Sequence, residues 1–253
     1  MKKLCANIFF LIFILSPQLF TQQFPTGSPE WLVDMFFSAE EFSNKANYYT
    51  GEMLNYSNEP TIGEELSGEA EIFFHQIKVT ENKIVFSVEV SNKNENIELY
   101  CYLIKIENNW KIDAVRRFLL PSFIYTVRDS LSHLNSLTMK DSTLLLSLQL
   151  FTASDYELKN YLRVNLNKFQ GLLLAFINNL KDQSDSTLAS VGCSAIYADG
   201  NYPGCIFIQI LEFEDMEVGF IHAADSKLLP EISVEEFICV EEVVRGWFLY
   251  RIL

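Results

Sequence analysis

The sequence of 253 residues has few of the side chains from which catalytic and metal sites are built. Its three histidines, His75, His133 and His222, are isolated from one another. It has no glycine-rich phosphate loop, no Gly-x-Ser-x-Gly, no His-Glu-x-x-His and no Cys-x-x-Cys pair. Zinc sites usually need paired cysteines or clustered histidines. We therefore predict no cofactor and no metal.

Positive charge is also scarce. Nineteen Lys and Arg residues stand against 33 Asp and Glu, which gives a formal charge of −14. A surface of this sign repels phosphate backbones and anionic lipids, so the composition argues against a nucleic-acid partner. Hydrophobic residues make up 49% of the chain and aromatic residues 14%, enough to build one large core or two ordinary ones.

Residues 1–23 differ from the rest of the chain. Two lysines precede an apolar run from Leu4 to Leu15, and Pro17 and a polar stretch follow. This order is typical of a secretory signal peptide, and the run is short for a bilayer crossing. We expect the protein to be exported, that is periplasmic, secreted or associated with the cell envelope. Contact with a membrane is expected only through this segment, if it is not cleaved.

Four cysteines remain beyond the signal segment. Cys193 and Cys205 flank a stretch with Asp-Gly and Pro-Gly turn signals, so their sulfurs could face each other across a hairpin. Export would allow a disulfide between them to persist. Cys101 and Cys239 are better interpreted as small buried apolar residues.

Elements in the first half follow the order helices, then strands. Ser28 and Pro29 form a helix start, and Ser38 with Glu41 predicts a capping box for a continuation through Met53. Four β-rich runs separated by short polar turns then cover residues 69–79, 83–90, 97–107 and 110–117.

The second half repeats this order. A capping box at Ser154 and Glu157 opens an apolar stripe that predicts one helix reaching Leu180. Strand-like runs follow at residues 188–198, 204–213, 216–224, 235–243 and 246–253. Both halves end on a hairpin with a tryptophan at the head of its second strand, Trp110 and Trp247. We predict an α+β protein of two modules, 24–120 and 121–253, each with amino-terminal helices packed on a curved antiparallel sheet.

The first half, roughly residues 28–118, resembles the nuclear transport factor 2-like superfamily and its exported bacterial branches of unknown function. The resemblance rests on amino-terminal helices, a curved sheet and a final strand written "NNWKIDAV". It implies a cone with a pocket between helices and sheet, a fold that serves isomerases, hydrolases, scaffold proteins and accessory binding domains. The second half is either a degenerate copy or an unrelated helix-plus-sheet module.

His75 is the one candidate catalytic residue. It shares a strand face with Phe73 and Ile77, so it would point into the cone or sit at the edge of a core. Three functions stay open: a non-catalytic binding or accessory module for a small molecule, peptide or protein, a small isomerase- or hydrolase-like enzyme working through His75, and a structural envelope protein. A carboxylate beside His75 within a pocket would favour the enzyme.

Overall fold

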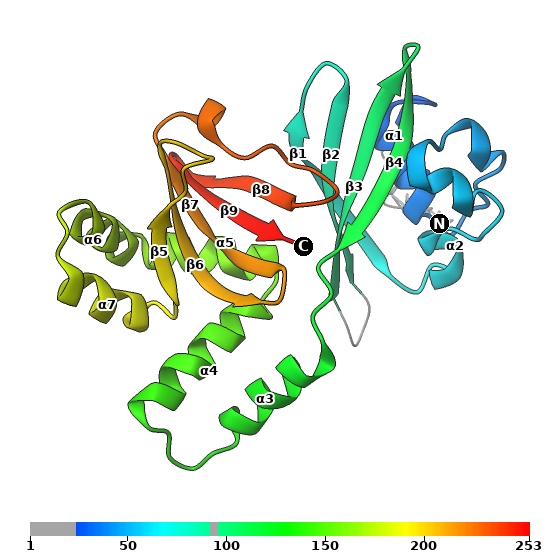
Figure 1. Cartoon of the computed structure of the whole chain (residues 1–253). Helices are drawn as coiled ribbons and strands as arrows, with labels where there is room; N and C mark the ends of the chain where they lie inside the picture. Colours follow the sequence, from blue (N-terminus) through cyan, green and yellow to red (C-terminus); the bar gives the residue numbers. More distant parts are fainter. Residues whose placement is uncertain (1–23, 92–95) are drawn as a thin grey trace, which may run out of the picture.

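A computed structural model of the chain describes residues 24–91 and 96–253. The described residues form two separate antiparallel sheets, and helices pack on one face of each (Figure 1). The other faces of the two sheets meet at the centre of the molecule. The predicted α+β class with two helix-plus-sheet modules is confirmed, whereas the predicted signal peptide lies outside the described residues.

The first module is a simple meander behind short helices. Its strands lie in chain order, β1-β2-β3-β4, so β1 and β4 are the edges. The four predicted strand runs are confirmed. The elements are α1 (Pro29–Phe37), η1 (Lys45–Asn47), η2 (Gly51–Tyr56), α2 (Ile62–Leu66), β1 (Glu71–Val79), β2 (Lys83–Ser91), β3 (Asn96–Ile106) and β4 (Asn109–Arg117).

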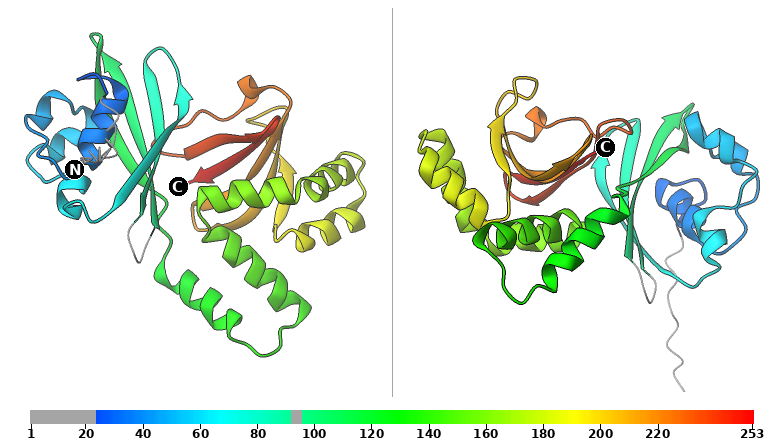
Figure 2. Two further views of the ribbon diagram at one scale, coloured as in Figure 1. Left: turned by 180° about the vertical axis from the view of Figure 1, so that it is seen from behind. Right: turned by 60° about the horizontal axis from the view of Figure 1, so that its bottom comes forward.

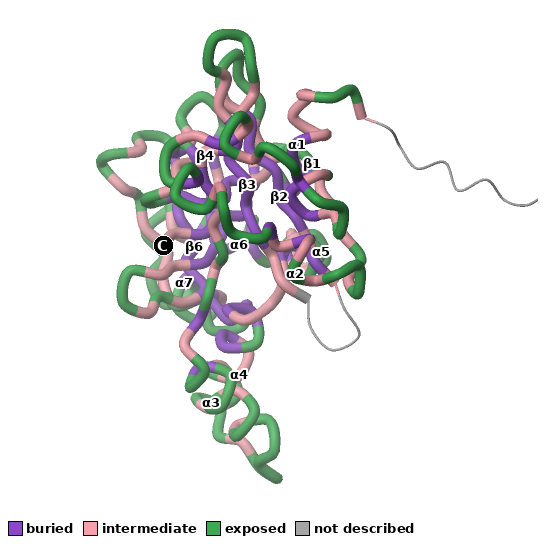
Figure 3. The backbone as a smooth tube through the Cα atoms, turned by 90° about the vertical axis from the view of Figure 1, so that its right-hand side faces the viewer, coloured by how far each residue is buried: buried purple, intermediate pink, exposed green. Residues whose placement is uncertain are grey.

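The second module has five helices before its sheet. These are α3 (Ser122–Ser132), α4 (Met139–Phe151), α5 (Asp155–Val164), α6 (Leu166–Ile177) and α7 (Lys181–Ser190). The strands are β5 (Ala195–Ala198), β6 (Cys205–Phe213), β7 (Met216–Ala223), β8 (Phe237–Val244) and β9 (Trp247–Ile252), with η3 (Ser226–Leu228) before β8. Helices α3 and α4 project from the body as a hairpin (Figure 2), and most of their residues are not buried (Figure 3).

The two tryptophan hairpins exist, but they occupy different places in their sheets. β4 is an edge strand, whereas β9 inserts between β7 and β8 in the order β5-β6-β7-β9-β8. Trp247 is therefore buried, with its ring against Phe169 and His222, while Trp110 is only half-buried beneath Lys105. The shared hairpin does not extend to a shared sheet topology.

The helix starts were predicted better than the helix lengths. Ser28 and Ser154 cap α1 and α5 as expected, and Glu157 completes the capping box. The predicted continuation after Ser38 is wrong, because α1 ends at Phe37 and the Ser38 hydroxyl accepts a hydrogen bond from the backbone of Glu40. The single helix predicted up to Leu180 is interrupted at Asn165, whose side-chain amide donates to the carbonyl of Tyr161 and whose own carbonyl starts α6.

The described residues form three hydrophobic cores: two lie on the helix side of one sheet each, and the third contains side chains of both sheets. Val85, Tyr100 and Tyr102 of the first sheet pack in this shared core against Phe207 and Tyr250 of the second. Polar contacts to β8 and to the loop before it add to this core: the Tyr102 hydroxyl donates to the carbonyl of Ile238 in β8 at 2.9 Å, and Arg116 Nε donates to the carbonyl of Val234 in the loop at 2.8 Å. The modules are therefore joined by a packed interior.

The disulfide that the sequence allows between Cys193 and Cys205 is not formed, and the four described cysteines are free and buried. Strand register explains the outcome. β5 pairs with β6 from Ala195 opposite Gln209 to Ala198 opposite Ile206, so the two cysteines lie at opposite ends of the paired stretch. Cys193 packs in the helix-side core of the second module, whereas Cys205 packs in the shared core.

None of the helices in residues 24–91 and 96–253 combines the length and the apolar composition that a bilayer crossing requires.

Because the modules share a core, we predict that they unfold together. Variants that keep only Trp110 (W31F/W247F) or only Trp247 (W31F/W110F) report on one module each. In urea, the fluorescence transition of each variant should coincide with its own far-ultraviolet circular dichroism transition. A Trp110 transition well separated from the dichroism transition would show that the first module unfolds on its own.

Candidate functional site

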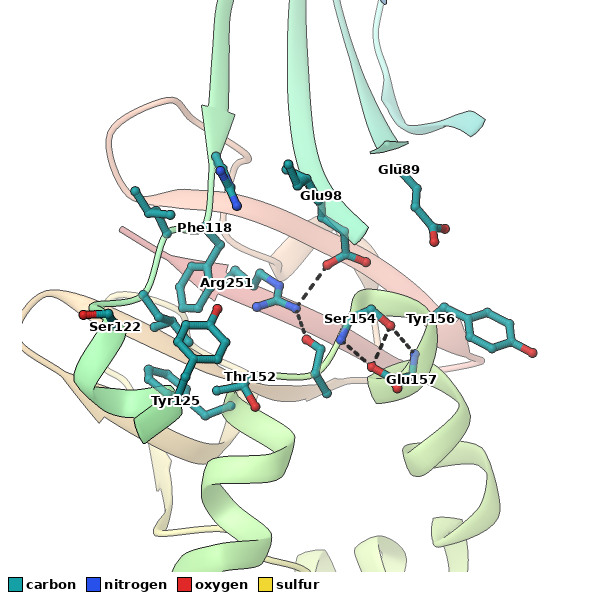
Figure 4. A pocket seen from close by; sticks show the side chains of 16 residues that line it. Glu89, Glu98, Phe118, Ser122, Tyr125, Thr152, Ser154, Tyr156, Glu157 and Arg251 are labelled. Carbon is teal, nitrogen blue, oxygen red and sulfur yellow. Dashed lines mark hydrogen bonds and ion pairs between the residues drawn. The ribbon is translucent and has the colours of Figure 1, made fainter. Parts of the chain in front are cut away.

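A buried arginine lies where the two modules meet. Arg251, on β9, is 2% exposed. Its Nε donates to Oδ1 of Asp155 at 2.7 Å. Its Nη2 donates to the carbonyl of Ala153 at 2.8 Å and lies 3.4 Å from Oε2 of Glu98 (Figure 4). The guanidinium thereby connects β9 with α5 of its own module and with β3 of the first module. We call Arg251, Asp155 and Glu98 the junction triad.

Asp155 is the carboxylate that stays ionised in this triad. It is the first residue of α5, where backbone N–H groups favour negative charge, and it accepts a 2.7 Å hydrogen bond from the hydroxyl of Tyr100. Burial alone would raise its pKa, but Arg251 and the bond from Tyr100 bring the pKa of Asp155 below its ordinary value. The Asp155–Arg251 pair is therefore a buried ion pair with its hydrogen bonds satisfied.

The pKa of Glu98 is shifted in the opposite direction. Burial, together with the neighbouring charge of Asp155, raises the pKa of Glu98 to about 8, although Arg251 and the backbone N–H of Asp155 both favour its charged form. On the neighbouring strand, Glu89 lies directly opposite Glu98 in the β2–β3 register. Like charges in this position repel each other. The carboxylate of Glu89 has no hydrogen bond or ion pair to any described residue.

A groove opens over the triad, with a volume of about 620 Å³. Its lining comes from both modules and from residues 118–121, which link β4 to α3, and we call it the junction groove (Figure 4). Its charged lining residues are Glu89, Glu98, Glu157, Arg117 and Arg251, while Phe118, Leu119 and Tyr125 give it an apolar wall. Leu119 and Tyr125 are 62% and 38% exposed, so this wall is open to solvent or to a ligand. Sites for small molecules typically measure about 300–1,000 Å³ and combine an apolar wall with a few polar groups.

His75 also lies between the modules, and the structure gives it the carboxylate that an enzyme would need. Its Nε2 is 3.0 Å from Oε1 of Glu241 on β8. Lys159 of α5 bonds both oxygens of the same carboxylate at 2.9 Å. Burial alone would raise the pKa of Glu241, but His75 and Lys159 lower it. His75 does not line the junction groove or the other main hollows formed by residues 24–91 and 96–253, and half of its side chain is exposed.

One group of side chains between the two clusters has the composition of a metal site. Ligand atoms of Asp155, Cys239 and Glu241 lie within 4.8 Å of one another. Both carboxylates already have cationic partners, Arg251 and Lys159. Burial and the charge of Asp155 hold the pKa of the Cys239 thiol well above its ordinary value, so the thiol stays protonated. The arrangement favours ion pairs within the protein over a bound cation.

The sequence pointed to one residue of this region and missed the others. The sequence predicts His75, but its partner Glu241 on β8 is 166 residues away, and Lys159 on α5, which bonds the same carboxylate, is 84 residues away. One feature of the sequence could have indicated the junction triad: an arginine, Arg251, stands within the otherwise apolar final run "GWFLYRIL". A charge in such a strand needs a buried partner, and the sequence could not say which acid supplies it.

No protein-family model matches the chain, and no curated protein matches it significantly.

The raised pKa of Glu98 predicts a specific pH dependence of stability. An acid whose pKa is higher in the folded chain than in the unfolded chain costs stability as the pH rises from its unfolded pKa through its folded pKa. The contribution of Glu98 to the free energy of unfolding should therefore fall as the pH rises from about 5 to about 8. E98Q should remove this loss, and it should be more stable than wild type at pH 8.5 but not at pH 5. Urea unfolding of wild type, E98Q and the exposed control E81Q at both pH values tests this, and an equal pH response of all three would contradict it.

Proposed function

We propose that the protein is an exported binding module that holds a ligand in the junction groove and performs no chemistry on it. The observation that carries the proposal is the pair of opposed carboxylates, Glu89 and Glu98, on the wall of a 620 Å³ groove. Binding sites tolerate such repulsion where a ligand relieves it. A groove with an exposed apolar wall also favours ligand binding over a purely structural role.

The charges of the groove indicate the class of ligand. The triad places one guanidinium beside two carboxylates, Glu89 and Glu157 add two more carboxylates, and Arg117 adds a second guanidinium. With all of them ionised the group is net negative, so a proton on Glu98 or an incoming cation neutralises part of it. An ammonium or guanidinium group between Glu89 and Glu98 would take that place. An apolar or aromatic portion of the same ligand would rest on Phe118 and Tyr125.

The resemblance of the first half to the nuclear transport factor 2-like superfamily supports a binding role but suggests a different location. In that superfamily the pocket lies between helices and sheet. Here Phe36, Phe37, Phe42 and Tyr49 are buried in that space and pack against Phe86 of the sheet. The helix side of the first sheet is a filled core, so we assign the ligand to the groove between the modules.

The alternative function is an enzyme that works through His75. The 3.0 Å contact with Glu241 favours it, because an oriented histidine is the usual general base. Lys159 opposes it by holding the same carboxylate, and a base of this kind also needs a cavity beside it for the substrate. We propose instead that the His75–Glu241–Lys159 cluster joins the modules, as the junction triad does.

Ligand binding can be tested with amines of known size. We expect phenethylamine and tyramine to raise the melting temperature of the full chain at pH 7.5, and phenylacetate, of similar shape and opposite charge, to leave it unchanged. E89Q should weaken amine binding at least tenfold, since a charge-assisted hydrogen bond is worth about 1.5–3 kcal/mol.

E81Q and H75Q are the matched controls and should bind as wild type does. Phenylacetate binding in place of the amines, or an unchanged affinity in E89Q, would contradict the proposed site. Loss of turnover on an identified substrate in folded H75Q would favour the enzyme.

Export is tested separately. The order of charged, apolar and polar residues in 1–23 predicts that the segment is removed or held at a membrane. Amino-terminal sequencing of the protein from fractionated host cells should find it outside the cytoplasm, with a start near residue 24 if the segment is cleaved. A chain starting at Met1 in the cytoplasmic fraction would contradict export.

A further inference from the structure

The free edge of the first sheet has properties that the proposed function does not use. β1 is an edge strand, and among the described residues it pairs only with β2. The outer backbone groups of an edge strand are a template for an added strand, which lysine, proline or a bulge usually blocks. In β1, Ile72, Phe73 and Phe74 follow one another, and the bulge comes only between Gln76 and Lys78. The amino-terminal half of β1, residues 71–74, therefore lacks the usual protection.

A hollow of about 1020 Å³ adjoins this half of β1, and we call it the edge groove. Its apolar lining comes from three segments: Phe24 before α1, Trp31 and Met35 of α1, and Ile72, Phe73 and Phe74 of β1. The Phe73 side chain is 60% exposed. An extended peptide binds to a sheet edge through two features. Unpaired backbone groups of the edge strand form main-chain hydrogen bonds with the peptide, and exposed aromatic side chains and hollows beside the strand contact its alternate side chains.

The edge groove is also acidic. Asp34 and Glu40 line it, and neither carboxylate has a basic partner in the part of the chain that the structure describes. Burial and the charge of Glu40 raise the pKa of Asp34. A positively charged side chain placed here would relieve the repulsion between these two acids. No lining residue is shared with the junction groove, so the two sites can be tested independently.

From the edge, the hollow and the charge together, we propose that the amino-terminal half of β1 docks an extended peptide segment of a partner protein. The peptide adds to the sheet as a strand beside residues 71–74. Alternate side chains of the peptide lie on opposite faces of the sheet: apolar ones rest on Phe73, while lysine or arginine ones pass along Trp31 and reach Asp34 and Glu40. The carboxyl-terminal half of β1 is not part of the site, because His75 is bonded to Glu241 and Gln76 to Glu30.

The test uses a fluorescein-labelled octapeptide of alternating valine and lysine, with a valine–glutamate octapeptide as its charge control. Fluorescence anisotropy on the full chain should show binding of the first and not of the second. F73K should weaken binding at least tenfold, because it places a like charge at the docking edge. L174K is the matched control: Leu174 is also 60% exposed, it lies on α6, and the variant adds the same charge. D34N should weaken the lysine peptide and leave a valine–threonine octapeptide unaffected.

A main-chain readout separates strand addition from attraction by charge alone. Hydrogen exchange of the amides in residues 71–74 should slow when the peptide is bound, while the exchange of α6 stays unchanged. Equal loss of binding in F73K and L174K, no protection of β1, or no binding by the wild-type chain would each overturn the proposal. Binding that appears only after residues 1–23 are removed would assign the groove to that basic and apolar segment instead.

Discussion

The arrangement of the two modules depends on one buried cation. The guanidinium of Arg251 is almost fully withdrawn from water, and such a charge is tolerated only with paired acids and satisfied hydrogen bonds. Asp155 and the carbonyl of Ala153 provide these within the second module, and Glu98 provides a further contact from the first. Together with the shared core, the contact with Glu98 holds β9 against the first sheet.

The same pairing creates the groove and its charge imbalance. One guanidinium cannot neutralise both Asp155 and Glu98, and the more favourable position of Asp155 at the start of α5 leaves Glu98 as the carboxylate with the raised pKa. Glu89 adds repulsion from the neighbouring strand. The site is thus incomplete without a proton or a cation, and this is why we place the ligand at the junction rather than in the aromatic core of the first module.

The sequence predicted features set by neighbouring residues and missed those set by distant ones. The caps at Ser28 and Ser154 and the strand runs depend on a few adjacent side chains, and the structure has them. The apolar stripe continues through Asn165, where the helix is interrupted, so periodicity alone could not predict the break between α5 and α6. The insertion of β9 between β7 and β8, and the meeting of Glu98 with Arg251, require pairing across long separations that hydrophobic pattern does not encode.

We propose that Glu98 keeps its proton near neutral pH and that a bound cation takes the place of this proton. The most direct measurement is a carbon-13 NMR titration of the Glu98 side-chain carboxyl in the full chain, alone and with saturating tyramine. The account predicts a pKa several units above that of an ordinary glutamate without the amine, near 8, and a clear fall when the amine is bound. An ordinary pKa in the free protein, or one that tyramine at saturation does not change, would contradict it.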